Sequence, residues 1–316
     1  MEKAGATINI GQGGRFEPEF RAASCRLAWF TGALVLAFAL PLYELARLSL
    51  KVDLYSHALA MPLIAGYLVW LTRHRLPERV ESSRGAAMVL VGIGVLCLAG
   101  WAAMASRGPL MANDRLAFLM GAFVSFFAAG VFNFMGTVFV RAVAYPLGLL
   151  IFMLPFPTPV RHALEVALQY GSAEAAYWLI KAAQIPVFRD GVVFVLPNIT
   201  LQVAEECSGI RSSFVLFITG LMAGFLFLES PRHRLWFTLL TIPLGILRNG
   251  FRVLTLAFLC VHIDPALIHS PIHHRGGPIF FALSLVPFFA LLLYWRKKEL
   301  RAKSRALEPG VALNNS

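Results

Sequence analysis

The sequence predicts an all-α polytopic membrane protein of about eight transmembrane helices, with a small extracytoplasmic insert made of a helix and a β-hairpin. Hydrophobic residues make up 58% of the 316 residues and charged residues only 14%, and the mean hydropathy is +0.69. Soluble globular chains carry about 25% charged residues, so the composition excludes that class. The apolar residues also fall in runs of about 20, the length that a helix needs to cross roughly 30 Å of hydrocarbon.

Eight apolar runs are long enough to be membrane spans. They lie at residues 27–46, 57–72, 86–105, 116–133, 138–156, 212–229, 235–260 and 278–295. The first run follows a polar arm and precedes seven others, which is typical of a signal anchor. Pro155, Pro157 and Pro159 end the fifth run, because prolines at that density do not continue a helix.

Lysine and arginine are concentrated in segments that share one side of the membrane if there are eight spans. These segments are the arm 1–26, the loops around residues 73–84 and 232–234, and the tail 296–316. The positive-inside rule therefore predicts that both termini are cytoplasmic. The net charge of +11 then reflects the topology and an attraction to anionic lipid. We expect no nucleic-acid partner, because the sequence carries no recognisable nucleic-acid-binding motif.

We predict three regions: a cytoplasmic N-terminal arm (1–26), a transmembrane domain (27–295) that contains an extracytoplasmic insert (157–211), and a basic cytoplasmic tail (296–316). Within the insert, residues 160–184 are predicted to form an amphipathic helix along the membrane surface. Its apolar face is predicted to consist of Leu164, Ala167, Leu168, Gly171, Ala175, Trp178 and Leu179. The β-branched residues on both sides of Pro197-Asn198 predict a hairpin within 191–203 that delivers residue 207 to the membrane surface.

Cys207 is the strongest candidate for a catalytic residue, because it lies in a polar segment directly before the sixth apolar run. A thiol has a pKa of about 8.5, and the free N–H groups at a helix start favour the nucleophilic thiolate. Glu205 and Glu206 oppose thiolate formation, so we expect at least one of them to bind Arg211, Arg248 or a positive charge of a substrate. The competing interpretations are a small buried residue or a disulfide with Cys260, which would block the chemistry.

The seventh run carries Arg248, Asn249 and Arg252 inside an apolar helix. An arginine within a span costs at least about 2.5–3.5 kcal/mol on insertion scales, so it usually faces a polar cavity and a partner. Arg248 and Arg252 are four residues apart and share a face, and Asn249 lies one turn from Arg252, whose guanidinium it would orient. The competing interpretation for each arginine is a structural salt bridge.

Four histidines, at positions 262, 269, 273 and 274, precede the eighth run. Zinc ligands usually include cysteines or carboxylates at tight spacing, and Asp264 is the one carboxylate near these histidines. We therefore expect no metal and no other cofactor, and consider the histidines as candidate bases.

These residues together resemble the exosortase/archaeosortase family of multi-span membrane cysteine transpeptidases. The resemblance rests on a cysteine before Ser-Gly at a helix start, an Asn-x-x-Arg in the next helix, and a His-x3-Gly-x3-Phe before the last helix. In this chain they are Cys207-Ser208-Gly209, Asn249-Gly250-Phe251-Arg252, and His273 with Gly277 and Phe281. Tyr55-Ser56-His57 and Pro155-Phe156-Pro157 also resemble family features, and the likeness covers roughly residues 27–295.

The resemblance implies a reaction on exported proteins that carry a C-terminal sorting signal of the PEP-CTERM type: a short motif, a transmembrane helix and a basic tail. Cys207 would form a thioacyl-enzyme, His273 would act as the base and Arg252 would hold the oxyanion. His274 is the alternative base, because the His-His and Gly-Gly doublets allow a shift of one residue. Supporting roles are expected for Arg248, Asn249, Ser208, Gly209 and Glu206.

Water, or an amine on a membrane lipid or a polymer, would resolve the thioester. The expected location is the inner membrane of a bacterium, in association with exopolysaccharide export, with the site facing outward. Two other classes compete with this one. A transporter is expected to have broken helices in two matching halves, and a non-catalytic scaffold for exported polymers would need no intact Cys-Arg-His set. A metalloprotease would need a motif such as His-Glu-x-x-His, which the sequence lacks.

Overall fold

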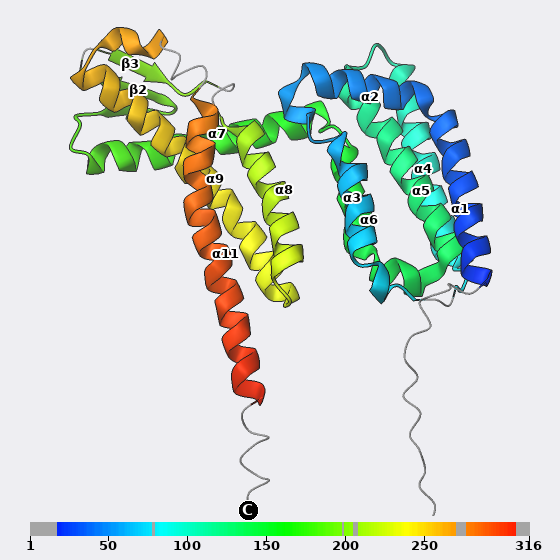
Figure 1. Ribbon diagram of the computed structural model, residues 1–316. Helices are drawn as coiled ribbons and strands as arrows, with labels where there is room; N and C mark the ends of the chain where they lie inside the picture. The colour runs from blue at the N-terminus through cyan, green and yellow to red at the C-terminus, as the bar shows by residue number, and fades with distance from the viewer. Residues whose placement is uncertain (1–17, 78–79, 198, 205–207, 270–275, 308–316) are drawn as a thin grey trace, which may run out of the picture. The chain divides into compact units, whose positions relative to one another are not determined.

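The computed structural model describes residues 18–77, 80–197, 199–204, 208–269 and 276–307 (Figure 1). The described residues form helices and a small three-stranded antiparallel sheet, so the predicted fold class is confirmed. The chain divides into two compact units, residues 1–158 and residues 159–316.

The first unit begins with a bent pair of helices, α1 (Pro18–Ala37) and α2 (Ala39–Lys51), which meet at 71°. The predicted first span, residues 27–46, thus corresponds to two helices joined by a bend. The break lies at Phe38, where φ is −102° and ψ is 19°. The Phe38 ring packs edge-on against Phe123 and Phe126, with ring centroids 5.6 and 6.2 Å away. These contacts hold the bend against the helix that carries both rings.

That helix is α5 (Ala112–Ala142), which packs against α4 (Arg84–Ala105). Gly136 interrupts α5 with φ 82° and ψ 175°, which are not helical angles. A Cβ atom at Gly136 would lie 1.6 Å from the carbonyl oxygen of Glu81, so only glycine lets the chain before α4 approach so closely. The predicted break between residues 133 and 138 is thus a real irregularity of the backbone.

The remaining elements of the first unit are the 3-10 turn η1 (Asp53–Tyr55), α3 (Ala60–Leu71), the 3-10 turn η2 (Arg73–Arg75), α6 (Ala144–Leu149) and the 3-10 turn η3 (Leu150–Met153). The helical chain ends at the proline-rich segment, as predicted. Thr158 is fixed by Asp114, which accepts hydrogen bonds from its N–H at 2.5 Å and from its hydroxyl at 2.8 Å. Asn113 donates to the carbonyl of Phe156 at 3.1 Å.

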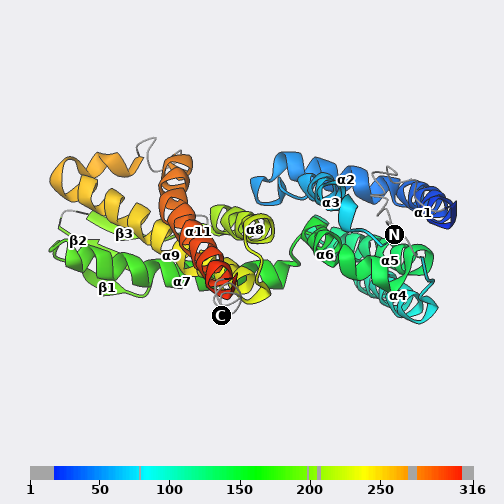
Figure 2. The same cartoon turned by 60° about the horizontal axis from the view of Figure 1, so that its bottom comes forward.

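The second unit contains α7 (Thr158–Ala182), whose first residue Thr158 belongs to the first unit, together with α8 (Ile210–Phe227), α9 (Pro231–His262), the 3-10 turn η5 (Pro265–His269) and α11 (Gly277–Leu307). Both ribbon views show α7 lying across the other three long helices, near the start of α8 and the start of α11 (Figures 1 and 2). The helix α7 confirms the helix predicted over 160–184.

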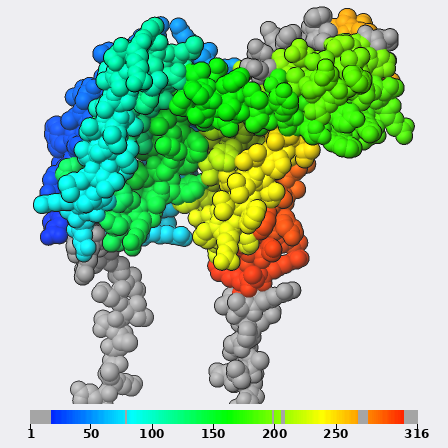
Figure 3. Space-filling model, turned by 180° about the vertical axis from the view of Figure 1, so that it is seen from behind, coloured from blue at the N-terminus to red at the C-terminus, as the bar shows by residue number. Residues whose placement is uncertain are grey.

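The apolar face predicted for this membrane-surface helix is not the side of α7 that is buried within the protein. Leu164 and Trp178 of that face are 38% and 58% exposed, whereas the buried side is made mostly of small or polar residues. These buried residues are Gln169, Ser172, Ala173, Ala176 and Ile180. Ala175, which belongs to the predicted face, lies at the close approach of α9, since a Cβ atom at Gly250 would lie 2.8 Å from its Cβ and 3.0 Å from the backbone nitrogen of the buried Ala176. Figure 3 shows the exposed side of α7, opposite its buried side, as part of the green surface of this unit.

A sheet of three short strands, β1 (Phe188–Asp190), β2 (Val193–Leu196) and β3 (Ile199–Gln202), packs against α7. The predicted hairpin is β2–β3, paired through Leu196 and Ile199 on either side of Pro197-Asn198, and β1 adds an edge strand that was not predicted. Phe194 is fully buried in the core that the sheet shares with α7 and α9.

By length and composition, the described residues provide six helices able to cross a membrane, and up to eight if each bent pair counts as one span. The second bent pair joins Ala144–Met153 to Thr158–Ala182 at 95°. The predicted eight spans correspond to the upper count. The chain is therefore a multi-pass membrane protein.

Candidate functional site

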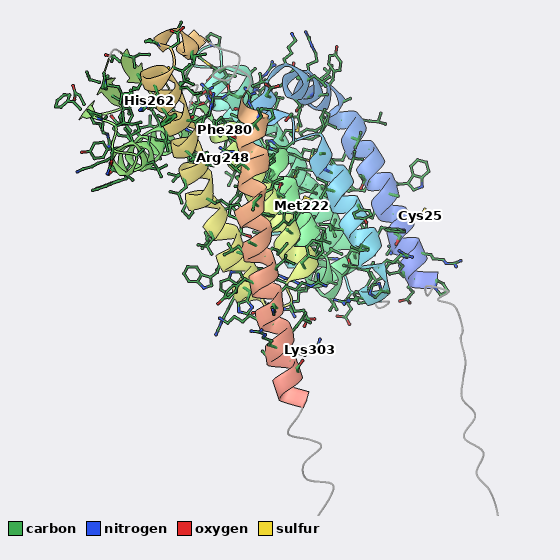
Figure 4. All side chains as sticks on the ribbon, turned by 60° about the vertical axis from the view of Figure 1, so that its left-hand side comes forward. Cys25, Met222, Arg248, His262, Phe280 and Lys303 are labelled. Carbon is green, nitrogen blue, oxygen red and sulfur yellow. The ribbon has the colours of Figure 1, made fainter. Side chains whose placement is uncertain are left out.

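Three regions singled out by the sequence meet at one end of the second unit. Because α8, α9 and α11 alternate in direction, the start of α8, the C-terminal half of α9 and the start of α11 lie at the same end (Figure 1). The rings of Phe251 on α9 and Phe280 on α11 have centroids 6.3 Å apart. Figure 4 labels Arg248 on α9 and Phe280 near the start of α11 in this region. The Asn-x-x-Arg segment is thus brought beside the starts of both neighbouring helices.

Gly209 forms the entry to α8 in a left-handed conformation, with φ 76° and ψ 14°. A Cβ atom there would lie 3.0 Å from Asn249 Cγ and 3.2 Å from Arg248 Nη2. Residues with a Cβ rarely adopt this conformation, and the neighbouring side chains leave little space for one. Both the backbone and the packing therefore require glycine at this position.

Arg248 connects α9 to the first turn of α8. Its guanidinium is buried, and Nη2 donates to the carbonyl of Gly209 at 3.4 Å and to the hydroxyl of Ser213 at 3.3 Å. Its Nη1 atom is also buried and has no hydrogen-bond partner within the described part of the chain. The described contacts of Arg248 are thus with neutral groups, and the glutamates expected as its partners, Glu205 and Glu206, lie outside the described residues.

Glycines bring the backbones of α8 and α9 close together. A Cβ atom at Gly245 would lie 2.7 Å from Ser213 Oγ, and one at Gly220 would lie 2.6 Å from Thr241 Cγ2. Small residues at such contacts let helices in a membrane approach closely. This packing holds the start of α8 in register with Arg248.

Asn249 is 2% exposed, and its side chain lies against Gly209. Arg252, one turn further along α9, is partly exposed. That Asn249 orients the Arg252 guanidinium stays a prediction. Ser208 is 1% exposed, and its hydroxyl has no hydrogen-bond partner among the residues that the structure describes. Buried polar side chains therefore surround the entry to α8 from two helices.

The predicted nucleophile and bases, Cys207, His273 and His274, lie outside the described residues, as does Glu206. Chain connectivity still limits the distance from Cys207 to the described site. Cys207 precedes Gly209 by two residues, and one residue spans at most about 3.6 Å. Within the described ranges there is no group of three or more His, Cys, Asp or Glu side chains able to hold a metal ion.

The sequence interpretation missed Gln169 and Ser213. Gln169 is 7% exposed and donates from Nε2 to the carbonyl of Val203 at 2.6 Å, a contact across 34 residues. No local signal marked Gln169, because α7 also carries other polar residues such as Glu165 and Glu174. The predicted face of α7 turned that residue outward.

A family model described as transmembrane exosortase (Exosortase_EpsH) matches residues 49–290, which is more than half of the chain. The chain belongs to the transmembrane exosortase family. The match includes all three motif regions of this exosortase, and members of its family are known as transpeptidases. Comparisons with curated proteins and with solved structures found no match.

Proposed function

We propose that this exosortase is a membrane cysteine transpeptidase that cleaves the C-terminal sorting signal of exported proteins. The observation that carries the proposal is the meeting of three chain regions at one end of the second unit. They are the Ser208-Gly209 entry to α8, the Asn249–Arg252 turn of α9 and the start of α11. Each region borders one member of the set Cys207, Arg252 and His273.

In the proposed reaction His273 accepts the proton of the Cys207 thiol, and the sulfur attacks the carbonyl carbon of the scissile amide. Arg252 holds the oxyanion of the tetrahedral intermediate as a fixed donor. The C–N bond then breaks, His273 returns the proton to the leaving amine, and a thioacyl-enzyme remains. Water or an amine on a lipid or polymer attacks the thioester and releases the thiol. His274 is the alternative base.

Arg248 has a supporting role in this proposal. Its hydrogen bonds to the Gly209 carbonyl and the Ser213 hydroxyl give it a structural role at the entry to α8, whereas the Arg252 side chain is partly exposed. This division supports Arg252 as the clamp. Supporting roles are also proposed for Ser208 and Asn249, which lie at the entry to α8, and for Glu206, which directly precedes Cys207 in the sequence.

The proposed site faces the extracytoplasmic side of a bacterial inner membrane, with both termini in the cytoplasm. The positions of positive charge support this orientation, because Arg296, Lys297 and Lys298 lie toward the opposite end of α11 from Gly277. Basic residues prefer the cytoplasmic side of a span. The arm 1–26, the domain 27–295 with its insert 157–211, and the tail 296–316 remain our proposed organisation.

The test compares Cys207→Ala with the wild type and with Cys25→Ala, a control at an exposed cysteine of the first unit. A substrate carrying a motif, a transmembrane helix and a basic tail is co-expressed at matched enzyme abundance. We expect Cys207→Ala to abolish processing and Cys25→Ala to retain it. Full processing by Cys207→Ala would contradict the proposal and favour the scaffold or transporter.

A further inference from the structure

Gln169 is a buried polar side chain in the middle of α7. Burying an amide without a hydrogen bond is unfavourable, so a buried glutamine usually has a specific partner. Here the partner is the carbonyl oxygen of Val203, at 2.6 Å from Nε2. A side chain of α7 is thus joined to the backbone of the segment that leaves β3.

Val203 is fixed through both of its backbone polar groups. Its N–H donates to the carbonyl of Val192 at 3.0 Å, which extends the pairing next to β2, and its carbonyl accepts from Gln169. Its side chain is 3% exposed and packs in the core of the sheet and α7. The chain therefore leaves the sheet from a fixed point four residues before Cys207.

The other flank of the same segment is fixed from α9. The carbonyl of Gly209, two residues after Cys207, accepts a hydrogen bond from Arg248 at 3.4 Å. The two helices that supply these donors are packed tightly together, since a Cβ atom at Gly171 of α7 would lie 3.2 Å from Ile246 of α9. The distance between the two points of attachment is consequently set by the packing of α7 on α9.

We propose that Gln169 is a positioning residue for the Cys207 thiol. Its amide fixes the carbonyl of Val203 and so determines where the chain enters the segment that carries Cys207, while Arg248 fixes the exit. Gln169 acts through the backbone and contacts no reacting atom. This inference rests on the proposed function, in which Cys207 is the nucleophile.

The first variant is Gln169→Met, which has a similar length but no donor. We expect it to fold and to bind substrate with a KM close to that of the wild type. Its kcat should fall about tenfold to hundredfold, because a small displacement of a reacting group is costly. The rate of Cys207 alkylation by a neutral thiol reagent should change as well. The control is Gln202→Met, the same change at an exposed residue of β3 next to Val203, which should leave both rates unaltered.

The second variant, Gln169→Glu, adds a readout that a purely structural role would not produce. A protonated carboxyl group can donate to the Val203 carbonyl, whereas an ionised one cannot. The kcat of Gln169→Glu relative to the wild type should therefore rise as the pH is lowered. This kcat is expressed per folded protein at each pH, so that a loss of folding does not contribute to it. If Gln169→Met fails to fold, this pH dependence decides the question, and a relative kcat that does not change with pH overturns the inference.

The same assay separates failure of this inference from failure of the proposed function. Processing by Cys207→Ala would remove the nucleophile and with it the proposed function. Suppose instead that Cys207→Ala loses processing while a folded Gln169→Met keeps the wild-type kcat and alkylation rate. This result would leave the proposed function intact and overturn the role of Gln169.

Discussion

The entry to α8 offers a perturbation in which backbone strain and packing can be measured separately. Gly209 and Gly191 both have positive φ angles, 76° and 58°. At Gly191, in the turn between β1 and β2, an added Cβ atom would meet no atom within 4 Å. At Gly209 it would lie 3.0 Å from Asn249 Cγ and 3.2 Å from Arg248 Nη2. Replacing each with alanine therefore imposes the same kind of strain in two different surroundings.

The left-handed conformation costs a residue with a Cβ about 1–2 kcal/mol. Loss of the flexibility of glycine in the unfolded chain offsets about 0.4–1 kcal/mol of this. Gly191→Ala should thus destabilise the protein by about 0–1.6 kcal/mol. Gly209→Ala must also displace Asn249, which is 2% exposed, and overpacking of this kind costs about 1–3 kcal/mol more.

The assay is the thermal unfolding midpoint of the purified protein in detergent, together with the processing rate of each variant. We expect Gly209→Ala to have the lower midpoint and a strongly reduced processing rate, because its carbonyl contact with Arg248 is displaced. Gly191→Ala should process substrate normally. Equal midpoints and equal rates for the two variants would refute the account of the packing around Gly209.

Three further substitutions test the fold by the same thermal assay. Gly136→Ala should destabilise the protein by about 3 kcal/mol or more, because the new Cβ atom would overlap a backbone carbonyl. Its control is Gly148→Ala, which lies in open space and should change the unfolding midpoint little. Similar midpoints for the two variants would refute the close approach at α5. Asp114→Asn should lower the free energy of unfolding by about 1–2 kcal/mol, because the amide keeps only one acceptor oxygen for the N–H and the hydroxyl of Thr158. An unchanged unfolding midpoint would contradict those hydrogen bonds. Phe237→Ala should cost about 3–5 kcal/mol, because this fully buried ring packs 5.0 Å from Phe288; a loss below about 1 kcal/mol would show that the contact is absent.

Much of the fold could be predicted from the sequence because apolar runs and prolines are local signals. The ends of α4 and α8 and the helix break after Met153 follow from such signals. The bend at Phe38 could not be predicted, because it depends on aromatic contacts with Phe123 and Phe126, about 85 residues away in sequence. Periodicity likewise located α7 but not its buried side, where Ala176 lies at the close approach of Gly250.

The candidate site was predictable to a similar extent. Charged and amide side chains inside an apolar run identify Arg248, Asn249 and Arg252 as unusual, and the structure brings Arg248 and Asn249 to Gly209. Nothing local in the sequence distinguishes the buried Gln169 from a solvated glutamine, because its partner lies 34 residues away. Long-range hydrogen bonds of this kind become visible only when the helices are packed.

The central claim, that Cys207 is the nucleophile of a transpeptidase, is tested most directly by trapping the covalent intermediate. The purified protein is incubated with a sorting-signal substrate, quenched with acid and digested, and the peptide that contains Cys207 is analysed by mass spectrometry. The account predicts an acyl adduct on Cys207 that hydroxylamine removes and that Cys207→Ala lacks. Substrate cleavage without such an adduct, and undiminished in Cys207→Ala, would contradict it.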